Sequence, residues 1–227
     1  MGITVAYLHT SHVLIPVFTE VSRQVLPEAE QFHMVDESLI RNTIRDRTLT
    51  TTTARRLLGM IDSARQGGAD AVLVTCSSIG PAVSTAAGLF DFPVIRVDDA
   101  MAEEAVRAGH RIGVAATLRA TLEPTVALLL EKAAAARREV RVVESLCEGA
   151  FEAVLAGDTV THDRLLGEAL ARLVNDVDVV VLAQASMARF AQALPPDPTR
   201  APILSSPWLA VKRLRWTLFP DSAAVLH

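Results

Sequence analysis

The sequence has few cysteines and none of the common cofactor motifs, which excludes several kinds of site. Its 227 residues include two cysteines, Cys76 and Cys147, with no CxxC pair and no His/Cys cluster at metal-ligand spacing. A zinc site is therefore not expected. The patterns GxGxxG and GxxxxGK[ST] do not occur either, so the sequence predicts no nucleotide cofactor.

A basic surface and a long apolar run are also missing. Lys and Arg number 22 against 26 Asp and Glu, and the formal charge of -4 argues against nucleic-acid binding. No apolar run reaches the roughly 18 residues of a membrane helix, and no basic leader precedes an apolar stretch. We expect a cytoplasmic protein, where a disulfide is not favoured. The cluster Lys212-Arg213-Leu214-Arg215 is interpreted as the solvated face of a helix.

Half of the residues are hydrophobic, and they gather in short continuous runs separated by helical segments. Such runs suit parallel strands buried on both faces, and their alternation with helices predicts a parallel sheet covered on both sides. The expected strands are residues 3–9, 31–36, 71–76, 93–97, 111–116, 140–144, 179–182 and 203–205. The clearest expected helices are residues 50–66, 118–137, 146–156 and 161–175.

The second half of the chain repeats the first at a nearly constant spacing. The matches are Glu37-Ser38-Leu39 with Glu144-Ser145-Leu146, Arg56-Leu57-Leu58-Gly59 with Arg164-Leu165-Leu166-Gly167, Asp70 with Asp178, and Pro93 with Pro202. The repeat predicts an α/β protein of two similar lobes that arose by internal duplication. We place them at residues 1–109 and 110–227, with the C-terminal helix able to cross to the first lobe.

On this repeat Cys76 lies opposite Gln184. Ligands of open α/β sheets bind beyond the carboxyl ends of the strands. We therefore expect both residues to line one cleft between the lobes, from opposite sides.

A reactive cysteine is the first candidate for this cleft. The apolar run 71–75 ends at Cys76-Ser77-Ser78, with Gly80 and Pro81 behind it. Ser77 or Ser78 is expected to cap the following helix, with Pro81 in the first turn. The free N–H groups of a helix start stabilise a thiolate, lower its pKa and hold a carboxylate. The residues leave two interpretations open, a reactive thiol beside an anion cradle or a buried inert cysteine.

Polar residues also end the strands that correspond to one another in the two lobes. His9, Thr10 and Ser11 end the first strand, and Thr117 ends the strand at 111–116. Thr117 is a helix N-cap, a carboxylate binder, or both. His9 is either a structural residue or an acid or base near neutral pH.

Two further residues complete the set of candidates. Ser186 stands two residues beyond Gln184, as Ser78 does beyond Cys76, and is a candidate cap for the matching helix. Cys147 lies in the segment ESLCEGAFEAVL, for which we predict a helix, and is expected to pack in the core.

Three stretches resemble one known family. GADAVLVTCSSIGPAV is similar to the first cysteine motif of the aspartate/glutamate racemase superfamily, which includes hydantoin racemases, maleate isomerases and arylmalonate decarboxylases. RIGVAATLRATLEPT resembles the strand and turn that open the second lobe of the hydantoin racemases. DVVVLAQASMARF resembles the second cysteine motif, usually a Gly-Cys pair followed by small residues and Met-Ala.

The resemblance implies a chemistry as well as a fold. In racemases of this superfamily two cysteines flank the substrate without a cofactor, and one removes the proton next to the carboxylate while the other returns one to the opposite face. Cys76 matches the first cysteine, with Ser77, Ser78 and Thr117 as carboxylate binders. The second position holds Gln184, preceded by Ala183 instead of glycine. A neutral amide binds substrate but does not shuttle protons.

Three functions remain open on the sequence. The first is an isomerase or racemase that acts next to a carboxylate with Cys76 alone, where inversion would need a further base such as His9. The second is a decarboxylase or lyase in which Cys76 protonates one face, although the single cysteine of arylmalonate decarboxylases sits in the second lobe. The third is a non-catalytic protein that binds small carboxylates. In each case we expect a small carboxylate ligand, no nucleic-acid or membrane partner, and a homodimer.

Overall fold

The computed structural model describes residues 2–195 and 200–220. Residues 1, 196–199 and 221–227, which fall within the predicted lobe ranges, lie outside the described residues. The chain forms two compact units, the first from Met1–Ala100 with Pro207–His227 and the second from Met101–Ser206. The sequence places this division after residue 109.

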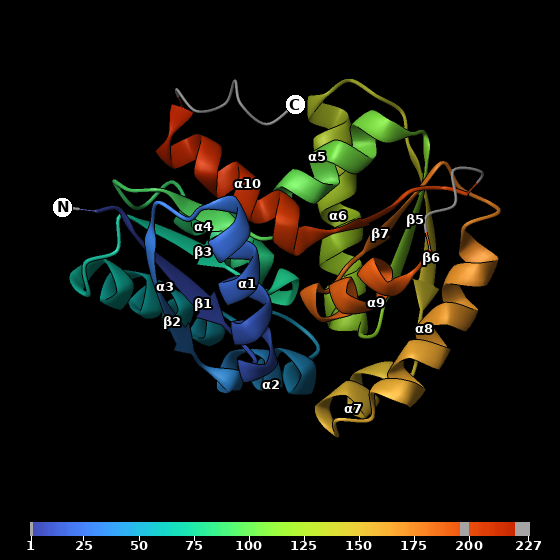
Figure 1. Ribbon diagram of the computed structural model, residues 1–227, viewed down its shortest axis with the longest axis horizontal. Helices are drawn as coiled ribbons and strands as arrows, with labels where there is room; N and C mark the ends of the chain where they lie inside the picture. Colours follow the sequence, from blue (N-terminus) through green and yellow to red (C-terminus); the bar gives the residue numbers. More distant parts are fainter. Residues whose placement is uncertain (1, 196–199, 221–227) are drawn as a thin grey trace. The chain divides into compact units, whose positions relative to one another are not determined.

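Each unit holds a four-stranded parallel sheet (Figure 1). The elements of the first unit are β1 (Thr4–His9), η1 (His12–Leu14), α1 (Ile15–Val25), β2 (Glu30–Val35), α2 (Glu37–Asp46), α3 (Thr51–Gln66), β3 (Ala71–Val74), η2 (Ser77–Ile79), α4 (Gly80–Ala86), β4 (Val94–Arg96) and α10 (Ser206–Leu218). The elements between β4 and α10, which form the second unit apart from the first two residues of α5, are α5 (Asp99–Ala108), β5 (Arg111–Ala116), α6 (Arg119–Ala135), β6 (Arg141–Leu146), α7 (Ala150–Leu155), α8 (Thr159–Leu173), β7 (Val179–Leu182), η3 (Ala185–Met187), α9 (Ala188–Ala193) and β8 (Ile203–Ser205).

The two sheets have the same strand order, β2-β1-β3-β4 and β6-β5-β7-β8. All strands are parallel, but the chain adds β2 on one side of β1 and adds β3 and β4 on the other side, and the second sheet follows the same pattern. The two central strands of each sheet therefore flank the topological switch point, which is where open α/β sheets bind ligands. The repeated aspartates make the same contact in the two units, to the backbone at the start of the first strand. Asp70 accepts a hydrogen bond from Thr4 N (2.9 Å), and Asp178 accepts one from Arg111 N (2.8 Å). The predicted fold class, two similar α/β lobes, is confirmed.

One of the four repeat matches is wrong. Glu37-Ser38-Leu39 begins helix α2, whereas Glu144-Ser145-Leu146 ends strand β6. The same error explains the helix predicted from residue 146, since β6 continues to Leu146 and α7 begins only at Ala150. Short identities in sequence do not mark equivalent positions when loops differ in length.

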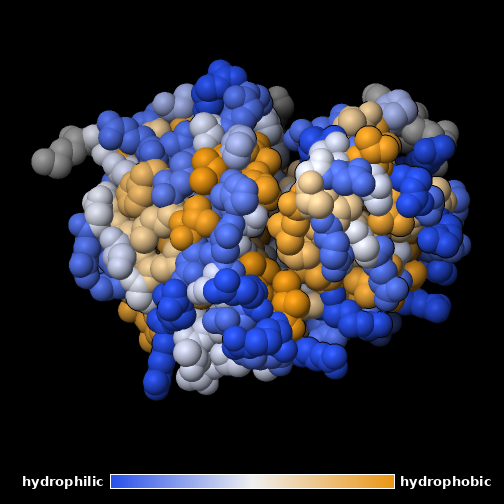
Figure 2. All heavy atoms as spheres, turned by 90° about the horizontal axis from the view of Figure 1, so that it is seen from below, coloured by the Kyte–Doolittle hydropathy of each residue, from blue (hydrophilic) through white to orange (hydrophobic). Residues whose placement is uncertain are grey.

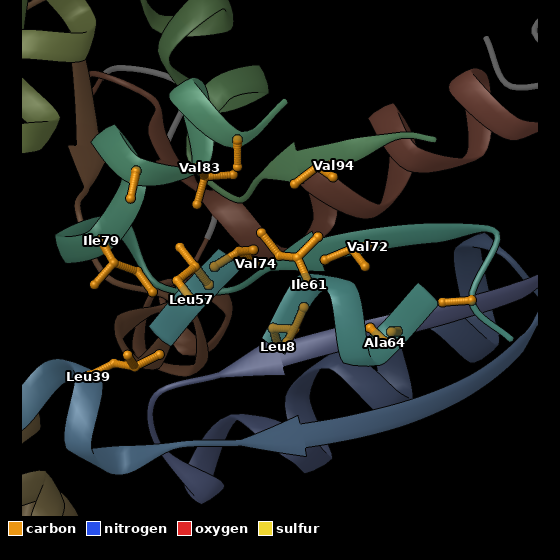
Figure 3. Packing of buried hydrophobic residues seen from close by; sticks show 14 of the residues in the cluster. Leu8, Leu39, Leu57, Ile61, Ala64, Val72, Val74, Ile79, Val83 and Val94 are labelled. Atoms are coloured by element: carbon orange, nitrogen blue, oxygen red, sulfur yellow. The ribbon is translucent and has the colours of Figure 1, made fainter. Parts of the chain in front are cut away.

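The core of the first unit lies between its sheet and helices α2, α3 and α4. Alternate strand residues such as Leu8, Val72 and Val74 are buried against Leu57 and Ile61 of α3 (Figure 3). Both faces of these central strands are covered, because Tyr7 packs its ring on Phe18 of α1 at 5.7 Å between centroids. This double burial explains why the strands read as continuous apolar runs.

A buried ion pair supports the start of α4. The guanidinium of Arg96 donates to both carboxylate oxygens of Asp98, at 2.6 and 3.0 Å, and to Ser84 Oγ at 3.3 Å. A Cβ atom on Gly80 would overlap this guanidinium. The glycine is therefore needed for the close approach of α4 to Arg96.

Hydrophilic residues are spread over both units in the view of Figure 2. No helix of the described part of the chain is long and apolar enough to cross a membrane. The basic cluster of α10 is not simply a solvated face. Leu214 is fully buried, and Arg215 donates to Val25 O at 2.7 Å and to Glu28 at 2.9 Å, because α10 packs beside the end of α1.

Candidate active site

The candidate site of the first unit lies at the carboxyl ends of its two central strands. β1 and β3 pair in parallel with Leu8 beside Val74, and Thr75 N donates to Leu8 O at 2.9 Å. The residues that follow are Thr10 after β1 and Cys76 after β3. The structure brings these two side chains together, and the Thr10 hydroxyl is hydrogen-bonded to the Cys76 thiol.

Burial and hydrogen bonding act on Cys76 in opposite directions. Burial raises the pKa of its thiol and is the largest influence, while Thr10 and the N–H groups of Ser78 and Ile79 lower it. The sequence predicts that donors at the helix start lower this pKa. They act in that direction, but burial outweighs them, so the thiol is protonated at neutral pH.

Two hydroxyl groups at the same edge of the sheet lack partners. Ser11 Oγ follows β1 and Ser77 Oγ follows β3, and both are buried with no hydrogen-bond partner among residues 2–195 and 200–220. A buried unsatisfied polar group costs about 1–3 kcal/mol, which a bound polar ligand would recover. The prediction that Ser77 or Ser78 caps α4 is wrong, because both residues lie in η2 and the N-cap of α4 is Ile79.

His9 belongs to a second network, on the α1 side of the sheet. It is fully buried, with Nδ1 at 2.8 Å from Thr75 Oγ1 and Nε2 at 2.8 Å from His33 Nδ1. Burial and the neighbouring His33 lower the pKa of His9 to about 4. Sequence reasoning did not single out His33; the available signal was its place in the strand next to β1.

The second unit has Thr117 and Gln184 at the matching strand ends, and they bind each other. Gln184 Oε1 accepts from Thr117 N at 2.7 Å, and Gln184 Nε2 donates to Thr117 Oγ1 at 2.6 Å. The N-cap of α6 is Leu118, so the predicted capping role of Thr117 is wrong. Ser186 lies half-buried within η3 and does not cap α9, whose N-cap is Met187.

The same cross-strand contact therefore occurs in both units. Thr10 meets Cys76 in the first unit, as Thr117 meets Gln184 in the second. A thiol with neighbouring unpaired hydroxyl groups stands in one, and an amide that is already hydrogen-bonded stands in the other. That Cys76 and Gln184 line one cleft stays a prediction.

Cys147 is a core residue, as predicted, although it does not lie in a helix. It follows β6, where its N–H donates to Ala116 O at 2.7 Å, and only 4% of its surface is exposed. Burial raises the pKa of its thiol to about 11. Across the described residues, no group of three or more His, Cys, Asp or Glu side chains is arranged to hold a metal ion.

Comparison with known families gives one match over most of the chain. The model of the family described as Asp/Glu/Hydantoin racemase matches residues 7–214. A search of curated proteins gave no match.

Solved structures of similar fold carry the same kind of description. Glutamate racemase from Bacillus anthracis is 19% identical with a TM-score of 0.74, over 97% of this chain and 83% of that one. Allantoin racemase from Klebsiella pneumoniae is 18% identical with a TM-score of 0.70, over 97% and 89%. Picrophilus torridus aspartate racemase is 14% identical with a TM-score of 0.71, over 95% and 94%. At these identities the structures establish the shared fold.

Proposed function

Because the chain belongs to the Asp/Glu/hydantoin racemase family, whose racemases are isomerases, we propose that it is a cofactor-independent isomerase with a single reacting thiol. Its substrate is a small carboxylate, and Cys76 acts at the carbon next to the carboxylate or at a double bond conjugated to it. The observation that carries the proposal is the contrast between the two strand ends. Cys76 is surrounded by hydrogen-bond donors, whereas Gln184 is closed on Thr117.

The substrate carboxylate is held by unused polar groups of the first unit. Ser11 Oγ and Ser77 Oγ have hydrogens to donate and no partner among the described residues. Hydroxyl groups and helix-start N–H groups are common carboxylate binders. The substrate-binding roles of Thr117 and Gln184 would require the substrate to break two existing hydrogen bonds, so we assign those residues a supporting role.

One thiol is sufficient for a cis–trans isomerisation. The Cys76 thiol first gives its proton to water, the thiolate adds to one carbon of a conjugated double bond, and the π electrons move toward the carboxylate. Rotation about the new single bond and loss of the thiolate then restore the double bond in the other geometry. Racemisation instead needs an acid or base on each face, and the amide of Gln184 is neither.

Decarboxylation is the second candidate, and the pKa of Cys76 favours it. Loss of CO2 from a malonate breaks a carbon–carbon bond and leaves its electron pair in an enediolate, which takes one proton on one face. A thiol that burial keeps protonated is a proton donor at neutral pH, and water returns the proton to sulfur afterwards.

The test is a substrate screen in D2O, followed by NMR. Hydantoins, 2-substituted acids, unsaturated diacids and malonates are incubated with the protein, and isomerisation, deuterium exchange and CO2 loss are recorded separately. We expect isomerisation, and we expect Cys76→Ala to lower its rate by roughly 10³-fold or more. Cys147→Ala is the matched control and should leave the rate unchanged. Turnover that survives in Cys76→Ala would refute the assignment, and CO2 loss would select the second candidate. Binding without turnover would indicate a carboxylate-binding protein.

Thiol labelling gives an independent check of Cys76. Timed alkylation of the native protein with iodoacetamide, read by mass spectrometry, should modify Cys76 faster than Cys147. The reason is that Cys147 is buried with a pKa of about 11, whereas Cys76 is only partly buried and hydrogen-bond donors offset part of the rise in its pKa. Faster labelling of Cys147 would contradict this expectation.

A further inference from the structure

A continuous string of hydrogen bonds crosses the first unit through two histidines. His9 is buried in β1 and His33 is half-buried in β2, on the side of the sheet that α1 covers. The links are Leu8 O to Thr75 Oγ1 (3.1 Å), Thr75 Oγ1 to His9 Nδ1 (2.8 Å), His9 Nε2 to His33 Nδ1 (2.8 Å), His33 Nε2 to Thr19 Oγ1 (3.1 Å), and Thr19 Oγ1 to Ile15 O (2.8 Å). The string runs from the buried Thr75 to the exposed Thr19.

The string is one hydrogen short when both imidazoles are neutral. Each link needs one hydrogen, but two hydroxyl groups and two neutral rings supply only one each. The missing hydrogen costs least at an end, where Leu8 O already accepts from Thr75 N at 2.9 Å. If the link without a hydrogen is at one end of the string, both rings carry their hydrogen on Nε2, and if it is at the other end, both carry it on Nδ1. His9 and His33 are therefore the same tautomer in either case. One added proton completes every link.

A second added proton is strongly disfavoured. It would place two imidazolium rings in direct contact, with Nε2 of His9 at 2.8 Å from Nδ1 of His33. Among the described residues, the groups that contact these two rings carry no negative charge. Tyr7 of β1 stacks on both rings with its pKa raised to about 12, Phe18 of α1 packs on His9, and β3 contributes Thr75.

The remaining ionisable groups of α1 and of the loop after β1 pair elsewhere. Glu20 accepts from Arg23 at 2.7 Å, and Glu37 accepts from His12 at 2.7 Å, both at the exposed surface. Burial lowers the pKa of His9 to about 4, and burial also lowers the pKa of His33. Uptake of the single proton therefore falls in the acid range.

We propose that His9 and His33 share one proton as a unit and position the strand ends that carry Thr10 and Cys76. The His9–Thr75 bond joins the side chains that directly precede those two residues, so it holds β1 and β3 in register at the thiol. In the protonated string the Thr75 hydroxyl is committed to Leu8 O and His9 donates to Thr75. The neutral string lets Thr75 turn to either side. The proposal concerns the thiol of the proposed function, and it is tested without turnover so that either can fail alone.

The first measurement uses the unmodified protein. Two-dimensional 15N NMR of the imidazoles should show the same tautomer for His9 and His33 at neutral pH. In acid, both rings should report one common midpoint below the ordinary value of 6.5. Opposite tautomers, or two separate protonation steps above a pH of about 4, would overturn the proposal.

The second measurement follows the thiol itself. In a Cys147→Ala background, the rate of Cys76 with 4,4′-dithiodipyridine is recorded across the acid range and at neutral pH. It should show a step at the histidine midpoint. His33→Asn keeps a hydrogen-bond partner for His9 but cannot share its proton, so the step should move to the midpoint of His9 alone and the neutral rate should be kept.

His33→Ala removes the hydrogen-bond partner of His9 and should change the neutral rate by about threefold or more, the factor that corresponds to one lost hydrogen bond. An unchanged neutral rate in His33→Ala, or a step that keeps its midpoint in His33→Asn, would refute the positioning role. Circular dichroism of each variant confirms that it is folded. The NMR outcome holds whether or not the variants fold.

Discussion

Replacing Gln184 with alanine removes both hydrogen bonds that close the strand ends of the second unit. The bonds to Thr117 N and Thr117 Oγ1 measure 2.7 and 2.6 Å, and Thr117 is 95% buried, with an exposed fraction of 5%. Each intramolecular hydrogen bond contributes about 0.5–1.5 kcal/mol, so the free energy of unfolding of the second unit should fall by about 1–3 kcal/mol. Native-state hydrogen exchange measures this at one site, because the protection of Thr117 N–H should drop by roughly 5- to 150-fold.

Gln184→Glu is the matched control for this prediction. Its carboxylate still accepts from Thr117 N, and the Thr117 hydroxyl turns from acceptor to donor, so both contacts survive. The amide of Thr117 should therefore keep most of its protection in Gln184→Glu. Equal loss of protection in the two variants would refute the reasoning, as would full protection in Gln184→Ala.

Two further predictions concern the first unit. Gly80→Ala should lower the free energy of unfolding by about 1–3 kcal/mol, because the new methyl group overlaps Arg96. In the control Gly59→Ala, in α3, the methyl group meets no atom and should raise the free energy of unfolding by about 0.5–1 kcal/mol. Urea unfolding compares the two variants, and equal effects would contradict the packing argument. Stability should also fall as the pH drops from about 6.5 toward about 4, because the unfolded chain protonates His9 and His33 before the native pair accepts a proton. Urea unfolding across this range tests it, and a flat profile would contradict it.

Three of the four strands of the second unit were predicted with the bounds that the structure has. The ranges Arg111–Ala116, Val179–Leu182 and Ile203–Ser205 agree with the predicted bounds, since short and mostly apolar runs leave few alternatives. The position of Cys76 just beyond the end of β3 was also predictable, because the apolar run before it marks where the strand ends.

The partners of the site residues were not predictable in the same way. Local sequence rules predict that Thr117 caps a helix, but its hydrogen-bond partner is Gln184, which lies 67 residues further along the chain. The His9–His33 contact depends on β1 and β2 pairing in parallel, with Tyr7 beside His33. Such contacts follow from strand register, which sequence pattern alone leaves open when both faces of a sheet are buried.

The return of α10 to the first unit has a consequence for synthesis on the ribosome. Arg215 binds Val25 O and Glu28 across separations of 190 and 187 residues, so the contact between α1 and α10 forms only after the whole second unit has been made. At about 5–20 residues per second this interval is about 10–40 s. The second unit, whose residues 101–206 are contiguous, can therefore complete its fold while the first still waits for its last helix.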